Sequence, residues 1–242
     1  MPVIQLICLL ALAKQDAAMQ KWAPNDPARP VPRVVTPGVA GAPPSDAIVL
    51  FNGGSLAKWE SVKGGRAPWK IGHGYFEVVP KSGDIRTRRG FGDCQAHVEF
   101  CEPTKIEGVD QKRGNSGVWL MGHYEVQILD SYRNKTYADG QAGAVYAQYP
   151  PLVNASRAPG QWQSYDIVFH RPRFDRQGRV RTKARMTVFH NGALIQDNVS
   201  LSGPSAFHAR PPYQRHPDKL PLQLQDHGNP VRFRNIWVRE LE

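Results

Sequence analysis

The chain of 242 residues is poor in cysteine, so it has few residues from which disulfide bonds or cysteine-bound metal sites could form. Its three cysteines are Cys8, Cys94 and Cys101. The first lies in the leader region, and the other two are an odd number of positions apart, so on one strand they would face opposite sides and could not pair. We find no zinc-finger spacing, glycine-rich phosphate loop, serine nucleophile elbow or HExxH motif. The sequence thus implies neither a disulfide framework nor a cysteine-based metal site.

Long hydrophobic runs are also missing. Residues 1–13 are nearly all apolar and end in Ala11-Leu12-Ala13, but this stretch is too short to span a bilayer and lacks the basic start of a signal peptide. We interpret residues 1–22 as a leader, a truncated secretory signal that would make the protein secreted or periplasmic. An N-terminal helix that docks on the domain is the alternative, and we expect no transmembrane segment.

Acidic residues are fewer than basic ones, 21 against 31, which gives a formal net charge of +10. Such a balance raises the question of a nucleic-acid partner, but no RNA-binding aromatic signature or basic helix accompanies it. Many of the basic residues fall between Arg171 and Arg185. Residues 179–188 alternate basic with apolar or small positions, which predicts a strand with a solvated basic face. A polyanion site on this strand is the competing interpretation, and a steep salt dependence of binding would mark it.

Glycine and proline are plentiful, with 22 and 21 residues, and they favour many turns and short strands over long helices. Prolines recur from Ala23 to Pro44, which predicts an extended linker ahead of a single domain over residues 45–242. We expect that domain to be an all-β, two-sheet antiparallel sandwich. The expected strands include residues 48–51, 75–79, 95–100, 142–146, 162–169, 179–188, 222–225 and 231–238.

The segment from Tyr124 to Leu129 bears most directly on function. Its alternation places Glu125 and Gln127 on one face of a strand and a β-branched and aromatic set on the other. Some retaining glycosidases on jelly-roll sandwiches line their sugar cleft with Glu-x-Asp-x-x-Glu. Here the spacing is kept as Glu-x-Gln-x-x-Asp, so Glu125 and Asp130 could still act as acid and base. A half-buried strand with polar residues facing solvent is the alternative.

A second polar cluster follows the predicted strand 222–225. This strand would present Gln223 and Gln225 on one face, and Asp226 and His227 come at its end, where catalytic groups are often held. We expect His227 to lie on the same concave face as Glu125. In the alternative, these residues form a turn whose side chains cap backbone groups.

Taken in order, several motifs resemble the 3-keto-disaccharide hydrolase domain family. They are Leu50-Phe51-Asn52-Gly53-Gly54 with Trp59, Asn115-Ser116-Gly117-Val118-Trp119-Leu120, Tyr124–Asp130, Ala142–Tyr146, Leu222–Gly228 and Val231–Ile236. The resemblance covers roughly residues 47–241. It implies a concanavalin A-like jelly roll of the lectin and glucanase type, and cleavage of glycosides already oxidised at C3.

The reaction that the resemblance implies requires chemical groups that particular residues of this sequence can supply. A ketone at C3 acidifies the proton on C2, so a base can remove it and the C1 substituent can leave by elimination before water adds. We expect Glu125 to be the base, His227 to protonate the leaving group or hold the enolate, and Asp130 to orient a partner. The residues expected to bind substrate are Asn115, Gln127, Tyr146, Gln225 and Arg234. No cofactor is required by the sequence, although a divalent ion held by Glu125, Asp130 and His227 would serve as a Lewis acid at the ketone.

Other carbohydrate functions fit the same residues. A non-catalytic, lectin-like module would bind sugar through the same amides and aromatic rings without needing proton-handling groups close together. A retaining glycosidase would need two carboxyl groups about 5–5.5 Å apart. An assay on 3-keto-glucosides beside the unoxidised sugars separates these readings.

Overall fold

The computed structural model describes residues 21–39 and 41–241, and the chain divides into two compact units, residues 1–35 and 36–242. Residues 21–35 of the first unit form turns and extended chain, with no helix or strand among them. Most of the leader predicted over residues 1–22 lies outside the described residues. Within the described ranges, no helix has the length and apolar character needed to cross a membrane.

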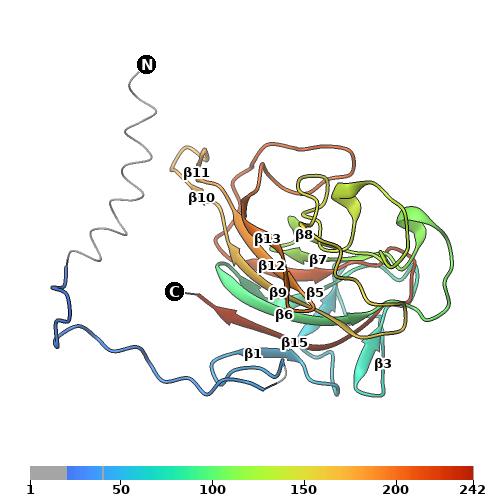
Figure 1. Ribbon diagram of the computed structural model, residues 1–242, viewed down its shortest axis with the longest axis horizontal. Helices are drawn as coiled ribbons and strands as arrows, with labels where there is room; N and C mark the ends of the chain where they lie inside the picture. Colours follow the sequence, from blue (N-terminus) through green and yellow to red (C-terminus); the bar gives the residue numbers. More distant parts are fainter. Residues whose placement is uncertain (1–20, 40, 242) are drawn as a thin grey trace. The chain divides into compact units, whose positions relative to one another are not determined.

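The second unit is built from two antiparallel sheets that lie over one another (Figure 1). The eight-stranded sheet has the order β13 (Ala193–Ser200), β12 (Arg185–His190), β9 (Gln163–His170), β6 (Cys94–Cys101), β15 (Arg232–Glu240), β4 (Tyr75–Glu77) and β3 (Lys70–Gly72), with β1 (Ile48–Phe51) also paired to β15. The five-stranded sheet has the order β2 (Trp59–Ser61), β5 (Ile85–Phe91), β14 (Leu220–Leu224), β7 (Ser116–Leu120) and β8 (Tyr124–Ile128). A small hairpin joins β10 (Arg173–Phe174) to β11 (Val180–Thr182). The only helical turns among the described residues are the short 3₁₀ turns η1 (Asp110–Lys112) and η2 (Ala138–Gly140).

The core lies between the two sheets and follows from the alternation within each strand. In β9, for example, Tyr165, Ile167 and Phe169 are buried while the residues between them are partly exposed. Burying each such large side chain contributes about 1.5–3 kcal/mol. Phe76 and Phe233 stack in the same core with ring centroids 5.6 Å apart. The predicted all-β, two-sheet antiparallel sandwich of the jelly-roll type is therefore confirmed.

One predicted strand, residues 142–146, is not a strand. Val145 makes isolated bridges to Val126 and Tyr149, and Gly143 turns the chain with a φ of +81°. The segment still covers the edge of β8, because the amide of Gln127 donates to Ala144 and the amide of Gly143 donates to Gln127. An edge strand that is paired in this way is closed to other chains.

The strand predicted over residues 179–188 is interrupted. It forms β11 and β12 as separate elements, because the amide of Ala184 between them donates to the Tyr213 hydroxyl (2.9 Å) rather than to a neighbouring strand. All three residues of β11 are exposed, so Val180, expected inside, faces solvent. Nearby basic side chains pair with acids, such as Arg173 with Asp93.

The last residues of the proline-rich stretch belong to the second unit. Thr36 and Ser45 exchange hydrogen bonds, from the Thr36 amide to the Ser45 hydroxyl (3.1 Å) and from the Ser45 amide to the Thr36 carbonyl (3.0 Å). The carbonyl of Gly41 accepts from the Asn235 amide (2.9 Å) and the Trp237 indole (3.0 Å) of β15. Gly41 therefore contacts β15 of the eight-stranded sheet, while the linker over residues 23–44 remains a prediction.

Candidate active site

A cavity of about 400 Å³ lies against β7, β8 and the end of β14. Its volume is within the range of small-ligand sites. Six of the eight residues predicted from the sequence line it. The full lining is Gln111, Lys112, Asn115, Trp119, Glu125, Gln127, Tyr137, Tyr146, Phe207, Gln225 and His227.

Glu125 points into this cavity because β8 alternates as predicted. Tyr124, Val126 and Ile128 are buried in the core between the sheets, which leaves Glu125 and Gln127 on the opposite face. The neighbouring strand, β7, provides the room for the Glu125 side chain.

That room comes from Gly117 of β7, which pairs with Gln127. A Cβ atom at this position would overlap Glu125 Oε1 and come within 2.8 Å of the Trp119 indole nitrogen. Trp119 pairs directly across from Glu125. Because residue 117 is a glycine, the Glu125 carboxyl and the Trp119 indole nitrogen can both lie close to its backbone.

The Glu125 carboxyl is 3% exposed, and no hydrogen bond reaches it from the described residues. Burial, reinforced by the Asp84 carboxylate, raises its pKa to about 8. A carboxyl with a pKa near neutrality can both take up and release a proton during turnover. Glu125 is also the only carboxylate among the described residues that line this cavity.

Gln111 of η1 orients the amide side chains of the cavity. Its own amide nitrogen donates to the Thr136 hydroxyl (2.8 Å) and the Gly140 carbonyl (2.9 Å). Gln127 donates to the Gln111 side-chain oxygen (2.9 Å), and Asn115 donates to the Gln111 main-chain carbonyl (2.7 Å). Because both amide nitrogens turn toward Gln111, their carbonyl oxygens remain for a ligand.

Four buried polar atoms of the cavity have no hydrogen-bond partner among the described residues. They are Asn115 Oδ1, Trp119 Nε1, Gln127 Oε1 and Gln225 Oε1. Leaving a buried polar atom unpaired costs about 1–3 kcal/mol. Three acceptors and one donor gathered in one cavity form a site for a ligand rich in hydroxyl groups.

His227 lines the cavity, as expected, while its neighbour Asp226 holds the turn. The Asp226 carboxylate accepts hydrogen bonds from the amides of Gly83 and Gly228, both 2.9 Å. His227 and Glu125 thus line the same cavity, and their catalytic roles remain predictions. The capping role considered for the pair belongs to Asp226.

Asp130 and Arg234 do not reach this cavity. Asp130 is 3% exposed, accepts from Arg113 Nε (2.6 Å) and lines a separate, smaller cavity. Arg234 lies on β15 of the other sheet, where it donates to Glu99 (2.6 Å) and covers the Trp162 ring at 4.1 Å. The structure therefore brings neither residue to Glu125.

The separation of Asp130 also bears on the divalent ion considered for Glu125, Asp130 and His227. Those three side chains do not converge. Within residues 21–39 and 41–241, no group of three or more His, Cys, Asp and Glu side chains is placed to hold a metal ion.

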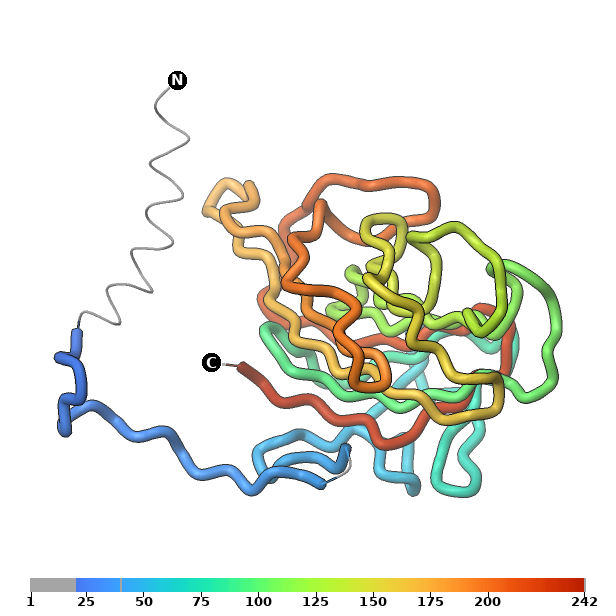
Figure 2. The backbone as a smooth tube through the Cα atoms, viewed as in Figure 1, coloured from blue at the N-terminus to red at the C-terminus, as the bar shows by residue number. Residues whose placement is uncertain are grey.

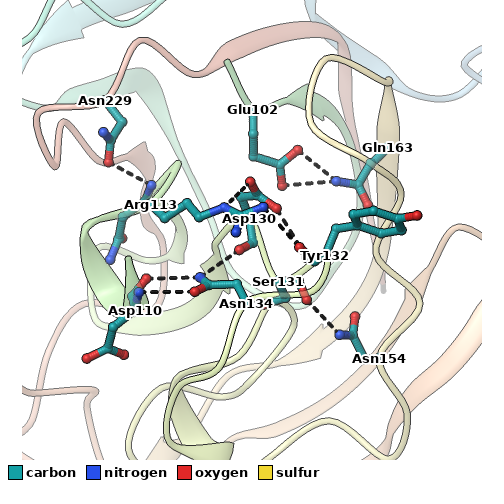
Figure 3. A network of polar contacts seen from close by, with 11 residues as sticks. Glu102, Asp110, Arg113, Asp130, Ser131, Tyr132, Asn134, Asn154, Gln163 and Asn229 are labelled. Carbon is teal, nitrogen blue, oxygen red and sulfur yellow. Dashed lines mark hydrogen bonds and ion pairs between the residues drawn. The ribbon is translucent and has the colours of Figure 1, made fainter. Parts of the chain in front are cut away.

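Asp130 instead belongs to a polar network that includes both ends of η1 (Figure 3). Asn134 lies between Asp110 and Asp130: its oxygen accepts from the Asp110 amide (3.0 Å), and its nitrogen donates to the carbonyls of Asp110 (3.0 Å) and Asp130 (2.8 Å). Arg113 reaches Asp130 from the other end of η1. The turn that carries Gln111 is thus fixed at both ends.

Five of the lining residues were not among the predicted site residues: Gln111, Lys112, Trp119, Tyr137 and Phe207. Gln111 and Lys112 lie in a 3₁₀ turn, and exposed Phe207 lies in a loop, so no periodic pattern distinguishes them. Trp119 had a usable signal. It lies two positions after Gly117 on a strand, and so on the same face.

Comparison with known proteins covers nearly the whole second unit. A family model described as a 3-keto-alpha-glucoside-1,2-lyase-like domain matches residues 46–239. A crystal structure from Parabacteroides distasonis ATCC 8503, named a "putative glycosyl hydrolase", is 48% identical, covers 88% of this chain and 93% of its own, and superposes with a TM-score of 0.85. A second structure of that name and organism is 21% identical, with 81% and 94% coverage and a TM-score of 0.61, which shows a shared fold. No curated protein matches the chain.

Proposed function

The chain belongs to the 3-keto-alpha-glucoside-1,2-lyase-like domain family, and on this basis and that of the Glu125 cavity we propose that it cleaves the glycosidic bond of 3-keto-glycosides. The family and the 48% identical relative support a glycoside-acting enzyme. One observation carries the proposal that the substrate is a 3-keto-glycoside. Glu125 is a buried carboxyl without a hydrogen bond, and it lies in the same cavity as the unpaired polar atoms that suit sugar hydroxyls.

The proposed reaction starts at the C2 proton, which the neighbouring C3 ketone acidifies. Glu125 takes this proton, and the electron pair moves onto the ketone oxygen as an enolate. When the enolate collapses, the C1–oxygen bond breaks and the leaving oxygen gains a proton. Water then adds to C1 of the resulting enone, and C2 regains a proton.

Each step has a candidate group in the cavity. Among the described residues that line the cavity, the Trp119 indole is the one buried donor without a partner, and it lies beside Glu125, so it is suited to the ketone oxygen on which negative charge develops. His227 is suited to protonating the leaving oxygen. Asn115, Gln127 and Gln225 present oxygens that accept from sugar hydroxyls.

The residues that line the cavity also argue against the retaining glycosidase. That mechanism needs a second carboxyl about 5–5.5 Å from the first. Among the described lining residues, Glu125 has no such neighbour. A binding module without catalysis uses the same acceptors, and turnover distinguishes it from the proposed enzyme.

The test is the variant Glu125→Gln, assayed on a 3-keto-glucoside and on its unoxidised counterpart. The substitution keeps the shape of the side chain and removes the proton acceptor, so turnover should fall by about 10²–10⁴-fold while the protein stays folded. Glu77→Gln, on β4 of the other sheet and paired with Arg232, is the control and should retain full activity. A near-normal rate in Glu125→Gln, or equal cleavage of the unoxidised sugar, would overturn the proposal.

His227 and Asp226 provide a second, matched pair in the same assay. His227→Ala should reduce turnover and leave the melting temperature nearly unchanged, because the side chain is exposed. Asp226→Ala should mainly lower the melting temperature, because it removes two hydrogen bonds that hold the turn. The opposite pattern would make His227 a structural residue.

A further inference from the structure

Asp84 directly precedes β5 and is hydrogen-bonded to the end of β14. Its Oδ1 accepts from the Asp226 amide (2.8 Å), and its Oδ2 accepts from the Gln223 side-chain nitrogen (2.8 Å). β5 and β14 pair in the five-stranded sheet, so these segments lie side by side although 142 positions separate Asp84 from Asp226 (Figure 2). Asp84 is not among the residues that line the Glu125 cavity, so it can act on a substrate only through other residues.

We propose that Asp84 is a positioning residue for the Glu125 cavity: it fixes the turn that carries His227, and its negative charge acts on Glu125. The inference rests on the proposed function, because it takes Glu125 as the base and His227 as the group that protonates the leaving oxygen. Asp84 thus controls two proton-handling groups without contact with the substrate.

The turn is held by two reciprocal contacts. Asp84 accepts from the amide of Asp226, and the Asp226 carboxylate accepts from the amide of Gly83 (2.9 Å). Gly83 is fixed in its turn, because its carbonyl accepts from the indole of the buried Trp69 (3.0 Å). His227 follows directly after Asp226, so these contacts determine where the chain carries it away from the sheet.

The charge of Asp84 links this turn to Glu125. Burial, and then the Asp84 carboxylate, raise the pKa of Glu125 to about 8. The charged groups that face Asp84 itself are Asp226, His227 and Lys63, whose ammonium approaches the preceding glycine. Burial raises the pKa of Asp84, the charge of Asp226 adds to this rise, and the charge of His227 opposes it.

The two carboxyls ionise at different pH because their surroundings differ. Both oxygens of Asp84 accept hydrogen bonds, which stabilise its charged form and oppose the effect of burial on its pKa. The Glu125 carboxyl receives no hydrogen bond from the described residues. Asp84 is therefore charged while Glu125 still holds its proton, and that charge makes the ionised Glu125 a stronger base.

Other titratable side chains face Glu125 from the elements around it, and all of them line its cavity. They are Lys112 of η1, Tyr137 and Tyr146 of the connection after β8, and His227 after β14. The raised pKa of Glu125 is caused by burial and by Asp84 rather than by these groups. Removing the charge of Asp84 therefore tests its effect on the base.

The experiment is a pH–rate profile of the full chain on a 3-keto-glucoside, with the variants Asp84→Asn and Asp84→Ala. Asparagine keeps the shape and can still accept from the Asp226 amide, so the melting temperature should hardly change. The limb of kcat/KM near pH 8 should move down by about one pH unit, as expected when a neighbouring like charge is removed. Asp84→Ala should move the limb likewise and also lower kcat and the melting temperature, because both hydrogen bonds are lost.

Asp93→Asn is the matched control. Asp93 is a half-buried carboxylate just beyond the other end of β5, where it accepts from the Arg171 amide (2.8 Å) and pairs with Arg173. This variant should lower the melting temperature and leave the limb in place. The same pattern in Asp84→Asn would make Asp84 a purely structural residue and overturn the proposal.

Thermal melts test the link between the two carboxyls without turnover. At pH 9, Glu125→Gln should raise the melting temperature less in the Asp84→Asn background than in the unsubstituted protein, because the repulsion has already been removed. At pH 4 its effect should not depend on the background. Equal effects at pH 9 would overturn the inference while the proposed function stands. If the unsubstituted protein does not cleave a 3-keto-glucoside, the proposed function fails, and the catalytic role of Asp84 fails with it.

Discussion

At the scale of single residues, the reactivity of Glu125 is a product of where its strand places it. The side chain is 3% exposed and lies opposite Trp119. Burial disfavours the charged form, and the Asp84 carboxylate disfavours it further, so the pKa rises to about 8. The protein thus keeps a base whose proton affinity is several powers of ten above that of an ordinary glutamate.

This raised pKa predicts the pH dependence of both activity and stability. Glu125 acts as a base only when ionised, so kcat/KM should rise as the pH increases through about 8. Because the folded protein holds this proton more tightly than the unfolded chain does, the stabilising contribution is complete below the ordinary pKa of 4.5. It is lost as the pH rises to about 8 and above.

The measurements are a pH–rate profile and thermal melts at pH 4 and pH 9, each made on the unsubstituted protein and on Glu125→Gln. The residual activity of Glu125→Gln should lack the limb near pH 8. Its melting temperature should exceed that of the unsubstituted protein at pH 9 and not at pH 4. A flat pH–rate profile in the unsubstituted protein would show that ionisation of the Glu125 carboxyl does not control catalysis.

At the scale of elements, the cavity depends on the 3₁₀ turn η1, which Asn134 and Asp130 hold at its two ends. We expect Asp130→Asn to break the buried pair with Arg113 and destabilise the protein by about 3 kcal/mol. Because Gln111 would then orient Asn115 and Gln127 less well, KM should rise more than kcat falls.

Steady-state kinetics and denaturant unfolding test this, and Asp175→Asn serves as the control. Asp175 forms an exposed pair with Arg179, which should contribute about 0–1 kcal/mol. If Asp130→Asn loses turnover with an unchanged KM, Asp130 takes part in proton transfer as the sequence suggested.

The same elements show why some of the site could be predicted and some could not. Glu125 and Gln127 lie within a regular strand, where alternation in the sequence becomes a face in space. Asp130 lies beyond the end of β8, so the alternation within that strand could not predict where its side chain points. Gln111, which orients the amides, lies in a turn whose partners, Thr136 and Gly140, are more than twenty positions away.

Arg234 shows a different limit of sequence reasoning. Its segment was correctly predicted to be a strand, β15, and the motif around it resembles the family. Which sheet a strand joins depends on pairing across the whole chain, and β15 pairs with β6 and β4 rather than with β14. Residues 142–146 illustrate the same point, since they contact β8 through one bridge instead of a ladder.

At the scale of the whole molecule, the two units offer a test of how much of the chain catalysis needs. Deleting residues 23–35 should change neither kcat/KM nor the melting temperature, because they hold no helix or strand and do not line the Glu125 cavity. Deleting residues 23–44 should keep kcat/KM but lower the melting temperature, because Gly41 would no longer accept from Asn235 and Trp237.

Activity assays and melts of the two truncated proteins beside the full chain decide this. Loss of turnover in a folded protein that lacks only residues 23–35 would give the proline-rich stretch a catalytic part. Equal melting temperatures for the two truncations would show that the contacts of Gly41 contribute little to stability.

The division of the Glu125 cavity between strands and loops has an evolutionary consequence. Glu125 and Trp119 stand on paired strands of the five-stranded sheet, whereas Gln111, Tyr137 and Phe207 stand on connections between strands. Loops accept substitutions, insertions and deletions that strands in a packed sheet do not. Selection can therefore remodel one side of this cavity without displacing Glu125 or Trp119.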